Sequence, residues 1–206
     1  MTIEEIYNKF SEQAQEALSS IAYVSSRTFS LPDPVMQDKI KALVIKQSFL
    51  SIFAEWEHFL EHTTIWYSLG EASIKGKAPI KYISPLDEEH ANQIISGASK
   101  YPDWSNLEYV IKTVESLFEN GEPYKSALNG FSSTFLEIKK VRNVIAHNSK
   151  KSHSEFETLV RNKLNPSYVG ITPMEFLLQS KSGSIVFYRQ YITHLQNAAT
   201  LIATYQ

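Results

Sequence analysis

Apolar residues recur every three or four positions along most of this 206-residue chain, and polar residues lie between them. This spacing is the period of amphipathic α-helices. It predicts helices over residues 2–29, 35–69, 104–119, 132–147, 154–164 and 184–205. The second of these is about 35 residues long, which exceeds the usual length in globular proteins, so we expect it to be the central helix. Its apolar stripe consists of Leu43, Ile45, Phe49, Ile52, Trp56, Phe59 and Leu60.

Turn-forming residues separate these segments. Ser84-Pro85 opens one further short helix with acidic residues in its first turn, and breaks are predicted at 31–34, 99–103, 120–123, 148–152 and 165–166. Residues 70–84 are predicted to be a loop or a strand, 124–131 a connection, and 167–183 irregular or partly extended. The whole predicts an all-α helical bundle in one domain over residues 1–206. Residues 1–33 are its N-terminal helix and linker, either part of the bundle or an appendage.

Composition narrows the class of protein. Hydrophobic residues make up 43 % and charged residues 20 %, as in soluble globular chains, and only 7 glycines and 8 prolines are present, which favours long helices. Cysteine is absent, which excludes disulfides, cysteine nucleophiles and thiolate metal sites. The opening MTIEEIYNKF is not typical of a signal peptide, and no apolar run approaches the roughly 18 residues of a membrane span. We therefore expect a cytoplasmic protein with no membrane partner.

Candidate chemistry concentrates in the helix predicted over 132–147, SSTFLEIKKVRNVIAH. On a helical wheel Arg142 falls within the apolar face. A guanidinium there is costly unless it is paired or reaches a wet cleft. Two interpretations stay open: a buried ion pair, with Glu55 and Glu57 as candidate partners, or a site at a cleft or subunit interface. The apolar face itself consists of Phe131, Phe135, Ile138, Val141, Ile145 and Ala146.

Two polar residues accompany this arginine. Asn143 and His147 stand at i and i+4, on one side of the helix, where an amide can orient an imidazole ring. Arg142 and His147 are five residues apart, about 140° round an ideal helix, so we expect them to point in different directions. They converge only if the backbone swings His147 at the helix end, or if each active centre takes residues from two subunits.

Positive charge surrounds these three residues. Between Lys139 and Lys163 the chain has seven basic and two acidic residues, although its net charge is only −2. The overall charge excludes a globally basic nucleic-acid binder. A local basic stripe beside an arginine and a histidine is what a polyanion such as RNA requires, although a solvated charged surface looks the same. The candidate RNA-binding residues are Lys139, Lys140, Lys150 and Lys151.

The run from Arg142 to His147 resembles the Arg-x4-His signature of the HEPN superfamily, in which a polar residue, often asparagine, follows the arginine. The helix order is also similar to that of the RiboL-PSP-like and other stand-alone HEPN branches, over residues 35–205. The resemblance implies a HEPN-type helical bundle. It also implies a metal-independent endoribonuclease without a cofactor, usually a toxin or effector in prokaryotic antiviral defence.

The resemblance also implies roles for single residues. His147 would act on the 2′-hydroxyl as the acid or base, Arg142 would hold the scissile phosphate, and Asn143 would orient the pair. RNA carries its own nucleophile, so a base, a phosphate clamp and geometry suffice, and the products would be a 2′,3′-cyclic phosphate and a 5′-hydroxyl. HEPN enzymes are usually homodimers with a composite active site, and some have an antitoxin or an activating partner.

One position departs from the pattern. Some HEPN toxins carry a tyrosine two residues after the histidine, which a nucleotidyltransferase modifies, but this chain has Ser149. Neutralisation by tyrosine modification is therefore not expected. The alternative function is a catalytically inactive HEPN-like adaptor or RNA-binding module, in which Arg142 makes a structural ion pair.

Other histidines offer rival sites. His58, Glu61 and His62 match the H-x-x-E-H pattern of zinc proteases, but they lie opposite the apolar stripe, so we interpret them as a solvated polar face and expect no metal site. His153 is close enough to the motif to touch substrate, although such a residue is more often a surface histidine. His90 and His194 have no partner in register. We interpret the main aromatic residues as core: Trp56, Trp66, Trp104, Tyr188 and Tyr191.

Overall fold

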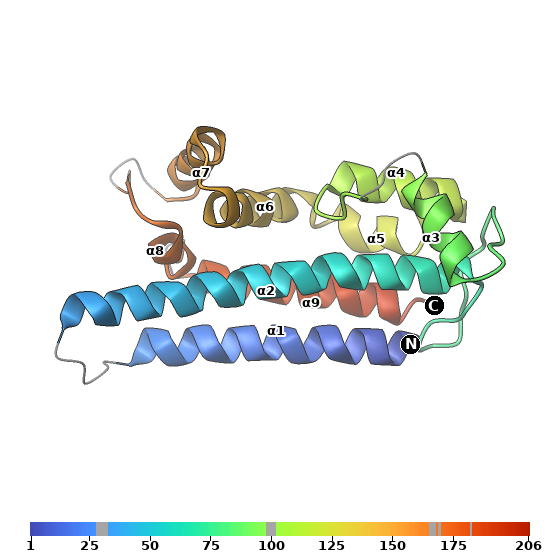
Figure 1. The fold of residues 1–206 in the computed structure, drawn as a ribbon, viewed down its shortest axis with the longest axis horizontal. Helices are drawn as coiled ribbons and strands as arrows, with labels where there is room; N and C mark the ends of the chain where they lie inside the picture. Colours follow the sequence, from blue (N-terminus) through green and yellow to red (C-terminus); the bar gives the residue numbers. More distant parts are fainter. Residues whose placement is uncertain (28–32, 98–101, 165–167, 169, 182) are drawn as a thin grey trace. The chain divides into compact units, whose positions relative to one another are not determined.

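The chain is an all-α helical bundle, and the computed structural model describes residues 1–27, 33–97, 102–164, 168, 170–181 and 183–206. No strand occurs in these ranges apart from one isolated bridge between Lys81 and Phe118. The elements, shown in Figure 1, are α1 (Ile3–Ser26), α2 (Pro34–Ser68), α3 (Glu88–Ser96), α4 (Leu107–Leu117), the 3₁₀ turn η1 (Glu119–Gly121), α5 (Tyr124–Asn129), α6 (Ser132–His147), α7 (Lys150–Lys163), α8 (Pro173–Leu177) and α9 (Phe187–Ala203).

The predicted long helix and the predicted motif helix are both confirmed, the latter with the same bounds as α6. Other boundaries were wrong. α4 begins at Leu107 because the Asn106 side chain caps it. α5 lies in the segment predicted to be a connection, and α8 in the one predicted to be irregular or partly extended. The predicted break at 148–152 is confirmed at Asn148 and Ser149, but α7 already begins at Lys150. The breaks at 31–32, 99–101 and 165–166 lie outside the described residues.

The chain forms two compact units, which are described separately. Unit 1 comprises residues 1–11, 55–132 and 195–206, and unit 2 comprises 12–54 and 133–194. The prediction of a single domain over residues 1–206 stays a prediction.

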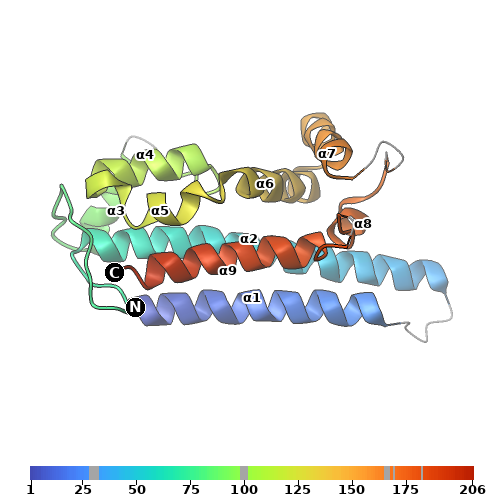
Figure 2. The same ribbon diagram turned by 180° about the vertical axis from the view of Figure 1, so that it is seen from behind.

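Unit 1 has an aromatic core with two satisfied hydroxyls. Phe10 packs on Phe59 with ring centroids 5.3 Å apart. The Tyr67 hydroxyl donates to the Ile202 carbonyl at 2.6 Å, and that of Tyr124 donates to Thr63 Oγ1 at 3.0 Å. Figure 2 shows α4 and α5 side by side in this unit, where they contact each other.

Buried tyrosines make alkaline stability predictable. Burial raises the pKa of the Tyr67, Tyr124 and Tyr191 hydroxyls well above the usual value near 10, and Glu137 adds to the shift at Tyr191. Because the pKa values of these hydroxyls are higher in the folded state than in the unfolded state, their contribution to the free energy of unfolding is fully present below about pH 10. It is lost as the pH rises further. Urea unfolding from pH 8 to 11.5 should show the free energy of unfolding falling above pH 10, less steeply in Tyr124→Phe. A flat profile in the wild type would contradict this.

Unit 2 carries the motif helix on an aromatic layer. Phe53 of α2 packs on Phe135 of α6, with centroids 6.0 Å apart, and Phe49 packs on Tyr191 of α9 at 6.5 Å. Glu137 of α6 binds Lys163 of α7 at 2.7 Å and accepts from the Tyr191 hydroxyl at 3.2 Å. These contacts fix one side of α6, so its opposite side is available for a site.

The buried face of α6 is narrower than predicted. Phe135, Ile138, Val141 and Val144 are buried, whereas Ile145 is partly covered and Ala146 is exposed. The four buried positions are three residues apart, so they form one row along the helix surface rather than a broad face. Similarly, Leu43 of the predicted α2 stripe is 67 % exposed, although the rest of that stripe is buried. Of the aromatic residues predicted to be core, Trp66 is partly buried and the other four are buried.

Candidate functional site

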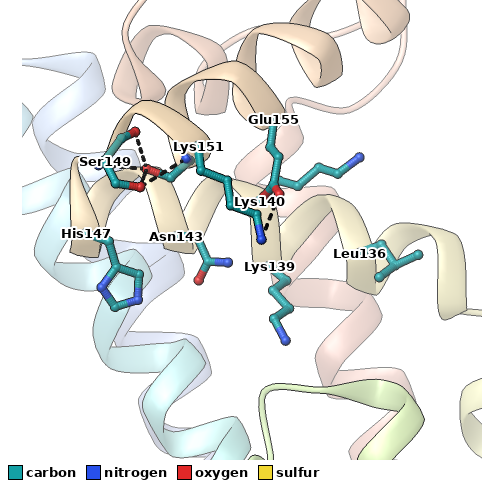
Figure 3. Close-up of a pocket in the computed structure, with 9 residues that line it drawn as sticks. Leu136, Lys139, Lys140, Asn143, His147, Ser149, Lys151 and Glu155 are labelled. Carbon is teal, nitrogen blue, oxygen red and sulfur yellow. Dashed lines mark hydrogen bonds and ion pairs between the residues drawn. The ribbon is translucent and has the colours of Figure 1, made fainter.

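A pocket of about 450 Å³ lies between α6 and α7, within unit 2. From α6 it is lined by Leu136, Lys139, Lys140, Asn143 and His147, and from the start of α7 by Ser149, Lys151, Ser152 and Glu155. Figure 3 shows the Lys139, Asn143 and His147 side chains leaving the same side of α6. They do so because their positions are four residues apart, which is close to one helical turn.

A tight turn between α6 and α7 directly follows His147, which lines this pocket. Asn148, directly after the helix, has φ +46°, a left-handed conformation that asparagine adopts more readily than most residues. Its Oδ1 accepts a hydrogen bond from His153 Nε2 at 2.7 Å. Ser149 then caps α7 through a reciprocal pair with Ser152: each side chain accepts from the other's backbone N–H, at 3.2 and 3.0 Å.

The conformation of Asn148 gives a testable prediction. Asn148→Ala should lower the free energy of unfolding by about 1 kcal/mol, because alanine is strained in the left-handed region. Asn148→Gly should recover most of that loss, because glycine has no Cβ to clash. Urea unfolding of the three proteins measures the difference. Equal stability of the alanine and glycine variants would contradict the geometry of this turn.

Arg142 is half-buried and contacts Phe53, Asn143 and His147 within unit 2. Its guanidinium carbon lies 5.4 Å from the centroid of the Phe53 ring, in a cation–π contact. Its Nη1 donates to Asn143 Oδ1 at 3.3 Å and lies 3.1 Å from His147 Nε2. The arginine that the wheel placed on an apolar face is thus held by an aromatic ring on one side and by polar partners on the other.

The expectation that Arg142 and His147 point in different directions was wrong. Side chains on an α-helix lean toward its N-terminus, so an imidazole on the last residue leans back over the preceding turn. The arginine side chain is long enough to cover the remaining angle. One chain therefore brings the two groups within hydrogen-bond distance, without a second subunit.

This contact identifies which ring nitrogen accepts. A guanidinium has only donors, so Nε2 of His147 is the acceptor. Nε2 is the nitrogen with the free electron pair, and it lies beside a permanent cation. A base and an anion-binding group in contact can take a proton and stabilise a phosphate at one place.

The lysines give the pocket a positive lining. Of the four predicted RNA-binding lysines, Lys139, Lys140 and Lys151 line it, whereas Lys150 is exposed and does not. Among the described lining residues Glu155 alone is acidic, and its Oε1 is 3.9 Å from Lys151 Nζ. No acidic residue occupies the first turn of α7, although helix N-termini favour acidic side chains.

The rival zinc pattern does not form a comparable centre. His58 and His62 have ring centroids 6.4 Å apart, and no group of three or more potential ligands among histidine, aspartate and glutamate occurs in the described part of the chain. His58 is exposed, but Glu61 and His62 are partly covered, so the face is less solvated than predicted. Glu55, a candidate partner of Arg142, binds Lys9 at 3.1 Å inside unit 1.

Several residues of the site were not predicted. Phe53 is far from the motif in sequence, and no periodicity links the two. The pair Ser149 and Ser152 did carry a signal, since serine followed three residues later by a polar residue is typical of a helix start. His153 was predicted near the motif, but its role in holding Asn148 depends on the helix beginning at Lys150.

No protein-family model, curated protein or solved structure matches this chain. The resemblance to the HEPN superfamily therefore depends on the motif and the helix order alone. Among the helices described, none combines the length and the apolar character that crossing a membrane requires.

Proposed function

We propose that this protein is a metal-independent endoribonuclease of the HEPN type. The observation that carries the proposal is the contact between Arg142 and His147, whose nitrogens are 3.1 Å apart, together with the lysine-lined pocket that His147 also lines. A neutral imidazole beside a fixed guanidinium is suited to cleaving a phosphodiester that carries its own nucleophile. RNA meets this condition through its 2′-hydroxyl, and DNA does not.

In the proposed reaction His147 Nε2 takes the proton of the 2′-hydroxyl. The 2′-oxygen forms a bond to phosphorus, the bond from phosphorus to O5′ breaks, and a proton is delivered to O5′. Arg142 stabilises the negative charge that gathers on the non-bridging oxygens, and Asn143 positions the guanidinium through its Oδ1. The bound phosphate takes over the Arg142 donors, which releases the electron pair of Nε2.

Delivery of the proton to O5′ supports a homodimer. A single His147 must both remove a proton on one side of the phosphate and supply one on the other. The His147 of a second copy, in its protonated imidazolium form, would donate the proton that O5′ takes up, while the first His147 keeps the proton of the 2′-hydroxyl, as in the composite sites of the HEPN family. We propose that the protein acts as such a dimer in the cytoplasm, as a toxin or effector of defence, under an antitoxin or activating partner.

The alternative is a catalytically inactive HEPN-like adaptor or RNA-binding module. It is favoured by the half-buried guanidinium of Arg142 over Phe53, since this contact also stabilises α6 against α2. In that case the lysines bind RNA and the histidine has no chemical role.

A cleavage assay on total RNA in EDTA tests the proposal. We expect fragments with 2′,3′-cyclic phosphate ends, because no step requires a divalent cation. Intact RNA at every protein concentration, for the dimeric protein as purified, would favour the inactive module. Cleavage that EDTA abolishes would instead indicate a metal-dependent nuclease.

A further inference from the structure

The pocket between α6 and α7 is lined by His147 but not by Arg142, and the proposed reaction leaves most of it unused. We infer that it binds a second nucleotide of the same RNA strand, with the flanking phosphate held by Lys139, Lys140 and Lys151. This inference rests on the proposed function and assigns to the enzyme a substrate longer than one phosphodiester link.

The flanking phosphate must differ from the scissile one. Lys139 and His147 are eight residues apart on α6, which corresponds to about 12 Å along the helix axis. Figure 3 shows their side chains on the same side of the helix, with Asn143 between them. One phosphate therefore cannot contact both groups closely, and a strand that places its scissile phosphate at His147 continues past the lysines.

The size of the pocket fits a nucleotide better than an isolated ion. About 450 Å³ falls within the range of about 300–1,000 Å³ typical of small-ligand pockets. Leu136 lines the same pocket and is 53 % exposed, so it offers an apolar surface for a ribose or base. Charged groups for the phosphate and an apolar wall for the nucleoside thus occur in one pocket.

The charges around the pocket also favour an anion. Three lysines from two helices face one space, and Lys151 lies in the first turn of α7, where the helix dipole disfavours a cation. A bound phosphate would reduce the repulsion among the three lysines and the repulsion between Lys151 and the helix dipole. Glu155 opposes this effect: its carboxylate lines the pocket and lies 3.9 Å from Lys151 Nζ.

Binding of 2′-O-methyl oligonucleotides tests the inference without cleavage, because the methyl group blocks the nucleophile. A labelled dinucleotide is compared with the same dinucleotide carrying a 5′- or a 3′-phosphate, by fluorescence anisotropy at low salt. We expect the phosphate at one of the two ends to tighten binding about tenfold, as a charge-assisted contact does. The gain should disappear in the double variant Lys139→Ala, Lys151→Ala.

Two further variants control the result. Lys39→Ala removes an exposed lysine of α2 outside the pocket and should keep the whole gain. Glu155→Gln should increase it, because repulsion of the phosphate is removed. No gain in the wild type, or an equal gain in the double variant, overturns the inference whether or not RNA is cleaved. A lysine-dependent gain without cleavage of total RNA supports the pocket and contradicts the nuclease.

Discussion

His147→Ala is expected to lower the rate of RNA cleavage at least about 100-fold, because a positioned general base contributes about 10²- to 10⁴-fold to a reaction of this kind. The side chain is exposed and its Nε2 lies 3.1 Å from Arg142 Nη1. Truncation should therefore leave the fold intact. The initial rate on a fluorogenic RNA in EDTA gives the effect, and thermal unfolding followed by circular dichroism shows whether the helices are retained.

His58→Ala is the matched control for this experiment. His58 is also an exposed histidine, but it lies on α2 in the rival zinc pattern and outside the pocket. Its loss should not change the rate. If His147→Ala kept wild-type activity while His58→Ala lost it, the assignment of the active site would be wrong.

Arg142→Ala should have the second large effect, lowering cleavage about 10²- to 10³-fold, as loss of one preorganised donor to a developing oxyanion does. Here stability should also fall, by about 0.5–2 kcal/mol, because the guanidinium loses its contact with the Phe53 ring. Arg142→Lys keeps the charge but loses the planar group that reaches Phe53, Asn143 and His147 together. We expect it to recover only part of the activity. The rates of all variants are compared at one temperature. Urea unfolding at that temperature first shows that each variant is folded in the absence of urea.

Arg161→Ala separates a specific effect from a loss of net charge. Arg161 lies on the exposed side of α7, with its Nη2 3.7 Å from Glu157 Oε2. It should behave as wild type in both measurements. Full activity of a folded Arg142→Ala protein would instead assign Arg142 a purely structural role and favour the inactive module.

The sequence predicted the long helices well and the short ones poorly. α6 spans 16 residues, enough for several repeats of the helical period, and its bounds were predicted correctly. α5 and α8 have six and five residues, too few for a period to be visible. Their starts depend on local capping, as in the reciprocal pair of Thr172 and Glu175, which a search for periodicity does not detect.

The residues of the candidate site were predictable, but their geometry was not. A helical wheel treats each side chain as a direction and ignores its length, so it separated Arg142 from His147, whose nitrogens are 3.1 Å apart. The cation–π contact of Arg142 is with Phe53, which lies 89 positions earlier in the chain. Only tertiary packing brings the two residues together. Lys150 was grouped with the pocket lysines because it belongs to the same basic stripe in the sequence, but its exposed side chain does not line the pocket.

A chimeric oligonucleotide with one ribonucleotide in a 2′-O-methyl strand tests the central claim most directly. If His147 and Arg142 promote attack by a 2′-hydroxyl, the wild-type protein in EDTA cleaves this strand only on the 3′ side of the single ribonucleotide. Mass spectrometry of the products should then find a 2′,3′-cyclic phosphate on one and a 5′-hydroxyl on the other. Cleavage at the methylated positions, or a 5′-phosphate on the product, would contradict this mechanism.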